Sequence, residues 1–177
     1  MNSFIRVTII IRTTVYYRYP TDFKYLLDKK PNAQAIIKGS KKYSSISGKV
    51  SFYNVYSGVL VISELTGMPF DSSKCKGRIF AFHIHNGESC TGNLDDPFAD
   101  ASTHYNPDNC PHPYHKGDMP PLFSTGGRAF SAFLSDRFTI DEIIGKAVIV
   151  HSSPDDFTTQ PSGNAGEKIA CGIIKEL

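Results

Sequence analysis

The chain of 177 residues contains no tryptophan, no long apolar run and no block rich in lysine and arginine. No stretch approaches the roughly 20 consecutive apolar residues that a membrane span requires. The formal net charge of +2 does not indicate nucleic acid as a partner, although a local positive field can still act on a small ligand. The sequence therefore predicts neither a membrane nor a nucleic-acid partner, and its length suits a single domain.

The N-terminal region lacks the features of a convincing secretory signal. Arg6 and Arg12 bracket a short apolar run, and no small-residue cleavage site follows it. Residues 22–30 could form one short helix, which Pro31 would end. We therefore expect residues 1–32 to be a leader and residues 33–177 to be the folded domain.

Cysteines in the C-x-x-C spacing are also missing, which argues against a thiolate zinc ribbon or a thioredoxin-type site. The cysteines are Cys75, Cys90, Cys110 and Cys171, and they allow two disulfides in three connectivities. A disulfide would favour an oxidising compartment, whereas the missing secretory signal argues the other way. The sequence leaves the localisation open.

Short β-type runs are present from residue 33 onward, separated by clusters of Gly, Pro, Asn and Ser. The runs are AQAIIKG, GKVSFYNVY, GVLVISEL, RIFAFHIH, RAFSAFLS, KAVIVHSS and KIACGIIK. A turn near Ser57 and Gly58 predicts a hairpin between the second and third runs, and FTIDEIIG suggests a helical turn. Six or seven strands in about 145 residues predict an all-β sandwich or Greek-key barrel.

One segment does not fit a minimal sandwich. Residues 86–127 contain scarcely a strand and are rich in Pro, Gly, Asn, Asp and His. A structureless loop of this length is uncommon in a compact domain unless it has a function or is tied down. Its prolines, including Pro107, Pro111 and Pro113, reduce the entropy lost when the loop becomes ordered.

Histidine is absent from the first 82 residues and is then concentrated in and around this loop. In FHIH, strand alternation places His83 and His85 on one face, where two imidazoles can chelate a single ion. A lone H-x-H motif is weak evidence for such a site. His151 ends the run AVIVH, and taken alone it would be an edge or hydrogen-bonding histidine.

The segment HYNPDNCPHPYHKGD brings together three more histidines and a carboxylate. His104, His112, His115 and Asp118 form a donor set that suits tetrahedral zinc. The alternative is a polar surface loop that happens to be rich in histidine. A bound metal would in addition explain how the loop is ordered.

Five motifs in a fixed order resemble the copper,zinc superoxide dismutase family, in its bacterial type with a short zinc loop. They are FHIH (82–85), HYNP (104–107), HKGD (115–118), VIVHSSPDD (148–156) and GNAGEKIACG (163–172). The resemblance implies a Greek-key β-sandwich or barrel of about eight antiparallel strands with long metal-binding loops. It also implies copper and zinc as cofactors and superoxide as the substrate. A homodimer is the assembly to consider, although no motif defines its contacts.

The resemblance also implies a role for each site residue. The copper ligands would be His83, His85, His104 and His151. The zinc ligands would be His104, His112, His115 and Asp118, so that His104 bridges the two ions and carries a proton during the reaction. Asp155 would join a copper ligand to a zinc ligand through hydrogen bonds.

The same resemblance pairs Cys90 with Cys171. Such a bond would close a loop of about 80 residues, which is worth on the order of 4 kcal/mol when the constraint on the unfolded chain is considered. Cys75 and Cys110 fall outside the family pattern, and they form either a second disulfide or two free thiols.

The chain departs from the family pattern at several places, among them the stretch from Cys90 to His104, which is longer than in the best-known members. His112 and His115 are only three residues apart, where the family has a longer insertion. Lys168 stands where the family usually has an arginine that attracts the substrate. Lysine keeps the charge but loses the planar fork, so we expect activity at a reduced rate. The alternatives are a non-catalytic copper-binding module, acting as a chaperone or buffer, and a structural domain that binds zinc alone.

Overall fold

The computed structural model describes residues 29–55, 57–71 and 78–177. Within these residues, nine strands form one antiparallel sheet in the order β4-β6-β7-β3-β2-β1-β9-β8-β5. The strands are β1 (Ala33–Gly39), β2 (Ser47–Val55), β3 (Gly58–Thr66), β4 (Ile79–Phe80), β5 (Phe82–His85), β6 (Leu122–Thr125), β7 (Arg128–Ser135), β8 (Ala147–His151) and β9 (Lys168–Glu176). Two 3-10 turns, η1 (Lys41–Tyr43) and η2 (Ala99–Ala101), and the one-turn helix α2 (Ile140–Ile143) complete the described elements.

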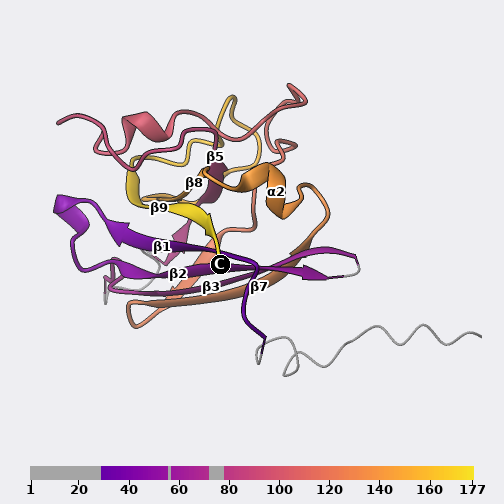
Figure 1. The fold of residues 1–177 in the computed structure, drawn as a ribbon. Coiled ribbons are helices and arrows are strands. Elements are labelled where there is room, and N and C mark those ends of the chain that lie inside the picture. The colour runs from indigo at the N-terminus through magenta and orange to yellow at the C-terminus, as the bar shows by residue number, and fades with distance from the viewer. Residues whose placement is uncertain (1–28, 56, 72–77) are drawn as a thin grey trace, which may run out of the picture.

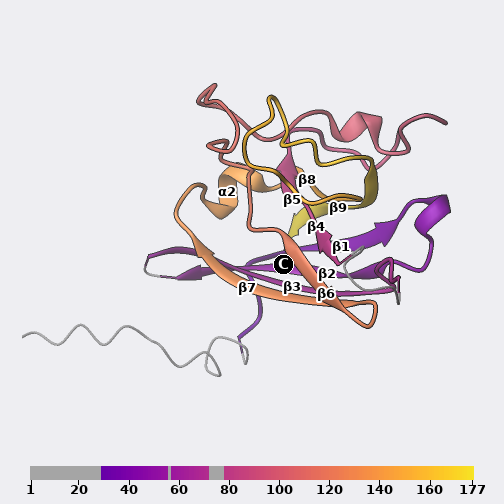
Figure 2. The ribbon, with the colours of Figure 1, turned by 180° about the vertical axis from the view of Figure 1, so that it is seen from behind.

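The sheet curls into a nearly closed barrel with two layers. Strands β1, β2, β3 and β7 lie in one layer, and β5, β8 and β9 lie above them (Figure 1). The view from behind shows β4 and β6 on the side of the barrel that faces away from the viewer in Figure 1 (Figure 2). Alternate side chains point inward and form a core that includes the fully buried Phe52, Val61 and Phe82. The prediction of an all-β barrel is confirmed.

The strand predictions differ from the structure in detail. The run 78–85 is divided into β4 and β5, because the Ala81 amide donates to Ser153 O at 2.8 Å instead of to a strand neighbour. β6 lies inside the segment expected to contain scarcely a strand. The division of the run 78–85 into two strands and the addition of β6 turn the seven predicted runs into nine strands within the described residues. The expected N-terminal helix at 22–30 lies almost wholly outside the described residues.

The helical turn expected from FTIDEIIG is α2. Thr139 caps it by accepting a hydrogen bond from the Glu142 amide, and the Glu142 side chain accepts one from the Thr139 amide in return. No helix in the described part of the chain is long and apolar enough to cross a membrane.

The long loop between β5 and β6 is ordered by the edge of β5. The Ile84 amide donates to Gly117 O and the Tyr105 amide donates to Ile84 O, each at 2.8 Å. A side chain at position 117 would meet Ile84 O at 2.2 Å, so this close approach requires glycine. The loop therefore covers the outer face of β5 and brings its polar side chains against that strand.

Candidate metal centre

The pairing of β5 with β8 places the first histidines on one face. His83 is opposite Ile149 and His85 is opposite Ala147, while the core side chains Phe82 and Ile84 point to the other face. His151 ends β8, where a β-bulge follows Val150. His83, His85 and His151 are all buried. Strand alternation thus brings together the three histidines that the sequence singled out in β-type runs.

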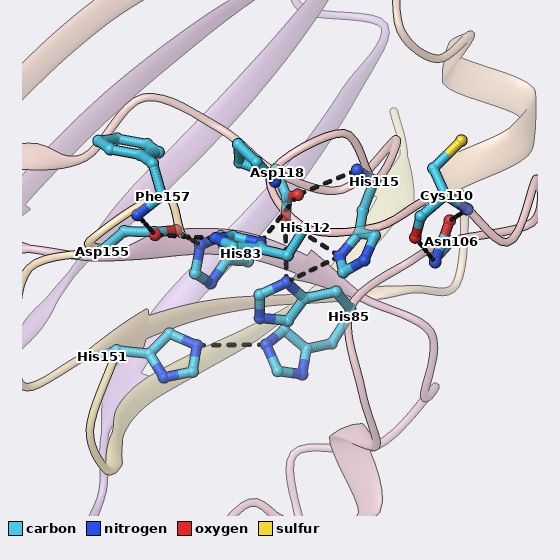
Figure 3. Close-up of polar contacts among 12 residues, drawn as sticks. His83, His85, Asn106, Cys110, His112, His115, Asp118, His151, Asp155 and Phe157 are labelled. Carbon is cyan, nitrogen blue, oxygen red and sulfur yellow. Dashed lines mark hydrogen bonds and ion pairs between the residues drawn. The ribbon is translucent and has the colours of Figure 1, made fainter. Parts of the chain in front are cut away.

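The long loop places the remaining histidines against this face. An isolated bridge joins His104 to His85, and a second joins Asp118 to His83. Figure 3 shows His112, His115 and Asp118 lying beside the strand histidines. The described residues contain two groups of potential metal ligands, and within each group the ligand atoms all lie within 4.8 Å of one another. The first group is His83, His85, His104 and His151, and the second is His104, His112, His115 and Asp118. These are the two predicted sets, and His104 belongs to both.

In the first group, each strand histidine uses one ring nitrogen for the protein and directs the other toward the group. His83 Nε2 is 2.7 Å from Asp155 Oδ2, His85 Nδ1 is 2.8 Å from Ser102 O, and His151 Nδ1 is 3.3 Å from Gly166 O. The remaining nitrogens face inward, and His85 Nε2 lies 3.2 Å from His151 Nε2. Outer hydrogen bonds of this kind fix the tautomer and the orientation of metal-binding imidazoles.

His104 uses both sides of its ring. Its Nδ1 lies 2.8 Å from Asp118 Oδ1 and 3.3 Å from His115 Nδ1, within the second group. Its Nε2 is buried and makes no hydrogen bond with any described residue. The two nitrogens therefore serve two different sets of neighbours.

The second group accommodates the short spacing between His112 and His115. The two ring centroids are 5.5 Å apart. His112 Nε2 is 2.9 Å from Asp155 Oδ1, which leaves Nδ1 3.1 Å from Asp118 Oδ2 without hydrogen-bond geometry. His115 Nδ1 lies 3.4 Å from Asp118 Oδ1. A three-residue separation is thus enough to bring both rings to one carboxylate.

Asp155 connects the two groups. One of its oxygens contacts His83 and the other contacts His112, and the Phe157 amide donates to it at 2.7 Å. Burial raises the pKa of Asp155, but these hydrogen bonds outweigh it and hold the pKa well below its ordinary value. Gly163 packs against this junction, where a Cβ atom would lie 1.9 Å from Asp155 Oδ1. The predicted contact of Asp155 with one member of each set is present.

The three strand histidines of the first group are poised to remain neutral. Burial lowers the pKa of His151 to about 3, and it also lowers the pKa values of His83 and His85. In the second group, burial lowers the pKa of His115. Burial raises the pKa of Asp118, but its hydrogen bond with His104 and the electrostatic effect of the neighbouring imidazoles outweigh it and lower the pKa overall. Neutral imidazole and ionised carboxylate are the forms that bind metal ions.

These residues fit copper and zinc. His83 Nδ1, His104 Nε2 and His112 Nδ1 are buried and make no hydrogen bond with described residues, a costly arrangement unless another partner is present. Each of the three belongs to a predicted ligand set. Four imidazoles suit copper(II), and three imidazoles with a carboxylate suit zinc.

A pocket of about 620 Å³ opens over the first group. His85, His104 and His151 line it, together with Lys168. The Lys168 ammonium is only partly exposed, and it forms an ion pair with Asp96 at 2.6 Å. The structure thus places Lys168 beside the candidate copper ligands, as the sequence predicted, but with a partner that the sequence did not indicate.

The disulfide between Cys90 and Cys171 attaches the long loop to β9, with a Cα–Cα distance of 5.7 Å. Cys110 has no disulfide partner among the described residues. Its predicted alternative partner, Cys75, lies outside them.

Sequence reasoning missed two residues at this site. Asp96 lies in a polar loop, and nothing local to it indicates a contact with Lys168. Arg137 follows β7, and its Nη1 lies 3.1–3.3 Å from the backbone carbonyls of Pro113, His115 and Asp118. Neither contact leaves a periodic or spacing signal, because each joins segments far apart in the chain.

Comparison with known proteins places the chain among metalloenzymes that have a β-barrel fold and histidine-rich metal sites. Residues 46–174 match the family model for copper/zinc superoxide dismutase. The chain is 34% identical over 136 residues to a Cu-Zn superoxide dismutase of Legionella pneumophila, covering 72% of this chain and 77% of that protein. It is 30% identical over 145 residues to superoxide dismutase [Cu-Zn] 2 of Aquifex aeolicus, covering 73% of this chain and 80% of that protein. The chain belongs to the copper/zinc superoxide dismutase family.

A solved structure agrees in fold. The Cu/Zn superoxide dismutase from Brucella abortus superimposes with a TM-score of 0.65 at 22% sequence identity. The match covers 80% of this chain and 98% of that one. The barrel and its connections are therefore those of a known family structure.

Proposed function

We propose that the chain is a superoxide dismutase that converts two superoxide anions and two protons to oxygen and hydrogen peroxide. Copper would be held by His83, His85, His104 and His151. Zinc would be held by His104, His112, His115 and Asp118. The observation that carries this proposal is that His104 belongs to both groups, with one nitrogen toward each.

Copper, when bound, supplies one-electron redox chemistry to the pocket. The protein's part is to hold three strand imidazoles as neutral, oriented donors through Asp155, Ser102 O and Gly166 O. One ring nitrogen of each strand histidine contacts the protein, and the other is left to bind the metal. These free nitrogens therefore need little rearrangement to face one ion. The family's redox cofactor thus fits a site whose geometry is already determined by β5 and β8.

Two side chains act on the substrate and its protons. His104 lines the pocket and its Nε2 makes no hydrogen bond with described residues, so this atom is placed to hold and release a proton there. Its Nδ1 is fixed by Asp118. Lys168 presents an ammonium group at the pocket wall, where it attracts the superoxide anion.

The two alternatives lack a comparable observation. A structural domain binding zinc alone has no need of the neutral, buried trio His83, His85 and His151. A copper chaperone or buffer has no need of a cation at the pocket wall, where Lys168 lies. The disulfide between Cys90 and Cys171 is consistent with an oxidising compartment. This observation does not distinguish the enzyme from the two alternatives.

The decisive experiment measures metal content and superoxide consumption on the same protein after loading with copper and zinc. We expect about one ion of each metal per chain, as the two donor sets allow. His83→Ala should lose copper and activity while it keeps zinc. His115→Ala is the matched control, because it removes an imidazole from the second group alone and should lose zinc while it keeps copper.

Two results would contradict the proposal. Tight copper binding without superoxide consumption would indicate storage or delivery. Zinc binding with no retained copper would make the domain structural.

A further inference from the structure

Lys168 is held at the pocket wall by two contacts on its ammonium group. Its Nζ lies 2.6 Å from Asp96 Oδ2 and 3.2 Å from Phe98 O. The Lys168 side chain is 15% exposed and that of Asp96 is 39% exposed. The pair therefore lies at the border between the pocket and solvent, where its net charge affects an approaching anion.

Asp96 is itself fixed in place. Its Oδ1 accepts a hydrogen bond from the Phe98 amide at 3.0 Å, so both carboxylate oxygens are engaged. Its backbone amide donates to Asn93 Oδ1 at 2.9 Å, and its carbonyl accepts from the Asn93 amide at 2.9 Å. These contacts distinguish the pair from an ordinary surface ion pair, whose long side chains move freely.

The surrounding loop is anchored on the same strands that hold the histidines. Phe98 packs in a small apolar cluster with Ile149 of β8 and Cys171 of β9, and the disulfide from Cys90 ends at Cys171. Lys168 is the residue paired with His151 across β8 and β9. The carboxylate of Asp96 thus has a defined position relative to the candidate copper ligands.

Most of the charged side chains that line the pocket, histidines apart, are acidic. Lys168 is accompanied by three acidic residues, Asp95, Asp96 and Glu167. Glu167 forms an ion pair with a different lysine, because its Oε1 lies 2.7 Å from Lys42 Nζ. Since Asp96 is the acid in direct contact with Lys168, its charge opposes most closely the field that the ammonium exerts in the pocket.

We infer that Asp96 is the counter-charge of the substrate pocket: it fixes the Lys168 ammonium against Phe98 O and restricts the affinity of the pocket for small anions. This inference rests on the proposed dismutase function, because the anion in question is superoxide. Removal of the carboxylate charge should strengthen the attraction of anions to the site. Asp96 is thus a positioning residue that determines how strongly Lys168 acts.

The test compares Asp96→Asn with Asp95→Asn in the protein loaded with copper and zinc. Asp95 lines the same pocket and has the same charge, but it forms no ion pair in the described part of the chain. The first readout is the affinity for azide, a small anion, measured by visible absorption of the copper site. We expect Asp96→Asn to raise it roughly five-fold and Asp95→Asn to raise it less than about two-fold.

Neutral imidazole is the matched ligand. A change of charge should leave its affinity for the loaded protein unaltered in Asp96→Asn, whereas a disturbed copper site would alter the binding of both ligands. The rate constant for superoxide should rise along with azide affinity, and it should depend more steeply on ionic strength than in the wild type. Asp96→Ser, whose hydroxyl can still accept from the Phe98 amide, should reproduce these changes if Asp96→Asn folds poorly.

Equal azide affinities in the wild type and Asp96→Asn, or a parallel change for azide and imidazole, would overturn the inference. A lower azide affinity would overturn it as well, because Lys168 would then require the carboxylate in order to act. Failure of the proposed function is distinguishable, since a loaded wild type without superoxide consumption still allows the comparison of azide affinities.

Discussion

The two candidate ligand groups are built from different kinds of structure. In the copper group, three of four histidines belong to β5 and β8, and the pairing of those strands determines their positions. In the zinc group, His104, His112, His115 and Asp118 all belong to the loop that follows β5. The first group is therefore a property of the barrel, whereas the second depends on how the loop is held.

Around the zinc ligands, polar contacts from several directions help to hold the loop. Ile84 pairs with its backbone, Arg137 contacts three of its carbonyls, and Lys116 forms an ion pair with Glu142 of α2 at 2.6 Å. A segment held by such contacts opens more easily than a strand with a buried apolar face. The difference predicts that metal binding stabilises the loop ligands most, whereas the three strand histidines of the copper group are already held in position.

The largest expected effect is that of zinc on the loop. Addition of zinc to metal-free protein should slow amide exchange across residues 104–118 much more than across β5 and β8. At a free zinc concentration about 1,000 times the dissociation constant, the stabilisation is about 4 kcal/mol, which lowers the population of the open loop, and with it the rate of amide exchange, about a thousand-fold. Hydrogen exchange followed by mass spectrometry measures both regions in one experiment.

The control for this prediction is the His115→Ala variant, in which zinc should have little effect on exchange. If the loop of the metal-free wild type were already as protected as β8, the contrast between a preformed and a metal-ordered group would be wrong.

The same contrast explains what could be read from the sequence. A strand has a period of two, which places His83 and His85 on one face, and the apolar Phe82 and Ile84 indicate that the other face is the core. Loop residues follow no such period. Their assignment to a zinc group depended on the type of their side chains and on the resemblance to a known family.

Contacts between distant segments were predictable only where the family resemblance implied them, as for Cys90 with Cys171. Asp96 meets Lys168 across 72 residues, and Arg137 meets His115 O across 22. β6 was missed because LFST is short and follows two prolines, so its alternation covers too few residues to be recognised. In each case the partner is determined by the closed barrel and not by local preference.

The next effect concerns the stability of the metal-free protein in acid. The pKa of His151 is lowered to about 3 by burial, so the unfolded chain binds a proton near pH 6.5 that the folded chain does not bind. The free energy of unfolding should therefore fall as the pH falls below about 6.5, by up to about 1.4 kcal/mol per pH unit for this histidine alone. His83 and His85, whose pKa values are also lowered, add to the slope.

Urea denaturation of the metal-free protein between pH 7 and pH 5 measures this slope. His151→Gln should make it shallower by roughly one proton, whereas His115→Gln, with a smaller depression of pKa, should change it less. If the two variants changed the pH dependence of the unfolding free energy equally, the predicted difference between strand histidines and loop histidines would be wrong.

The smallest expected effect tests what holds the loop when zinc is bound. Arg137→Met removes a cation that contacts the carbonyls of Pro113, His115 and Asp118 but touches no ligand side chain. Loss of a hydrogen bond from a charged donor costs about 1.5 kcal/mol, which should weaken zinc binding roughly ten-fold. Copper affinity should change much less, because three of the four copper ligands lie on β5 and β8.

Competition with a chromophoric chelator gives both affinities, and Arg137→Lys is the conservative control. Lysine restores one donor but cannot span three carbonyls, so zinc affinity should recover only in part. A parallel loss of copper and zinc affinity in Arg137→Met would show that the two groups are ordered together. In that case the bridging position of His104 would couple the loop to the strands more strongly than the separate origins of the two groups imply.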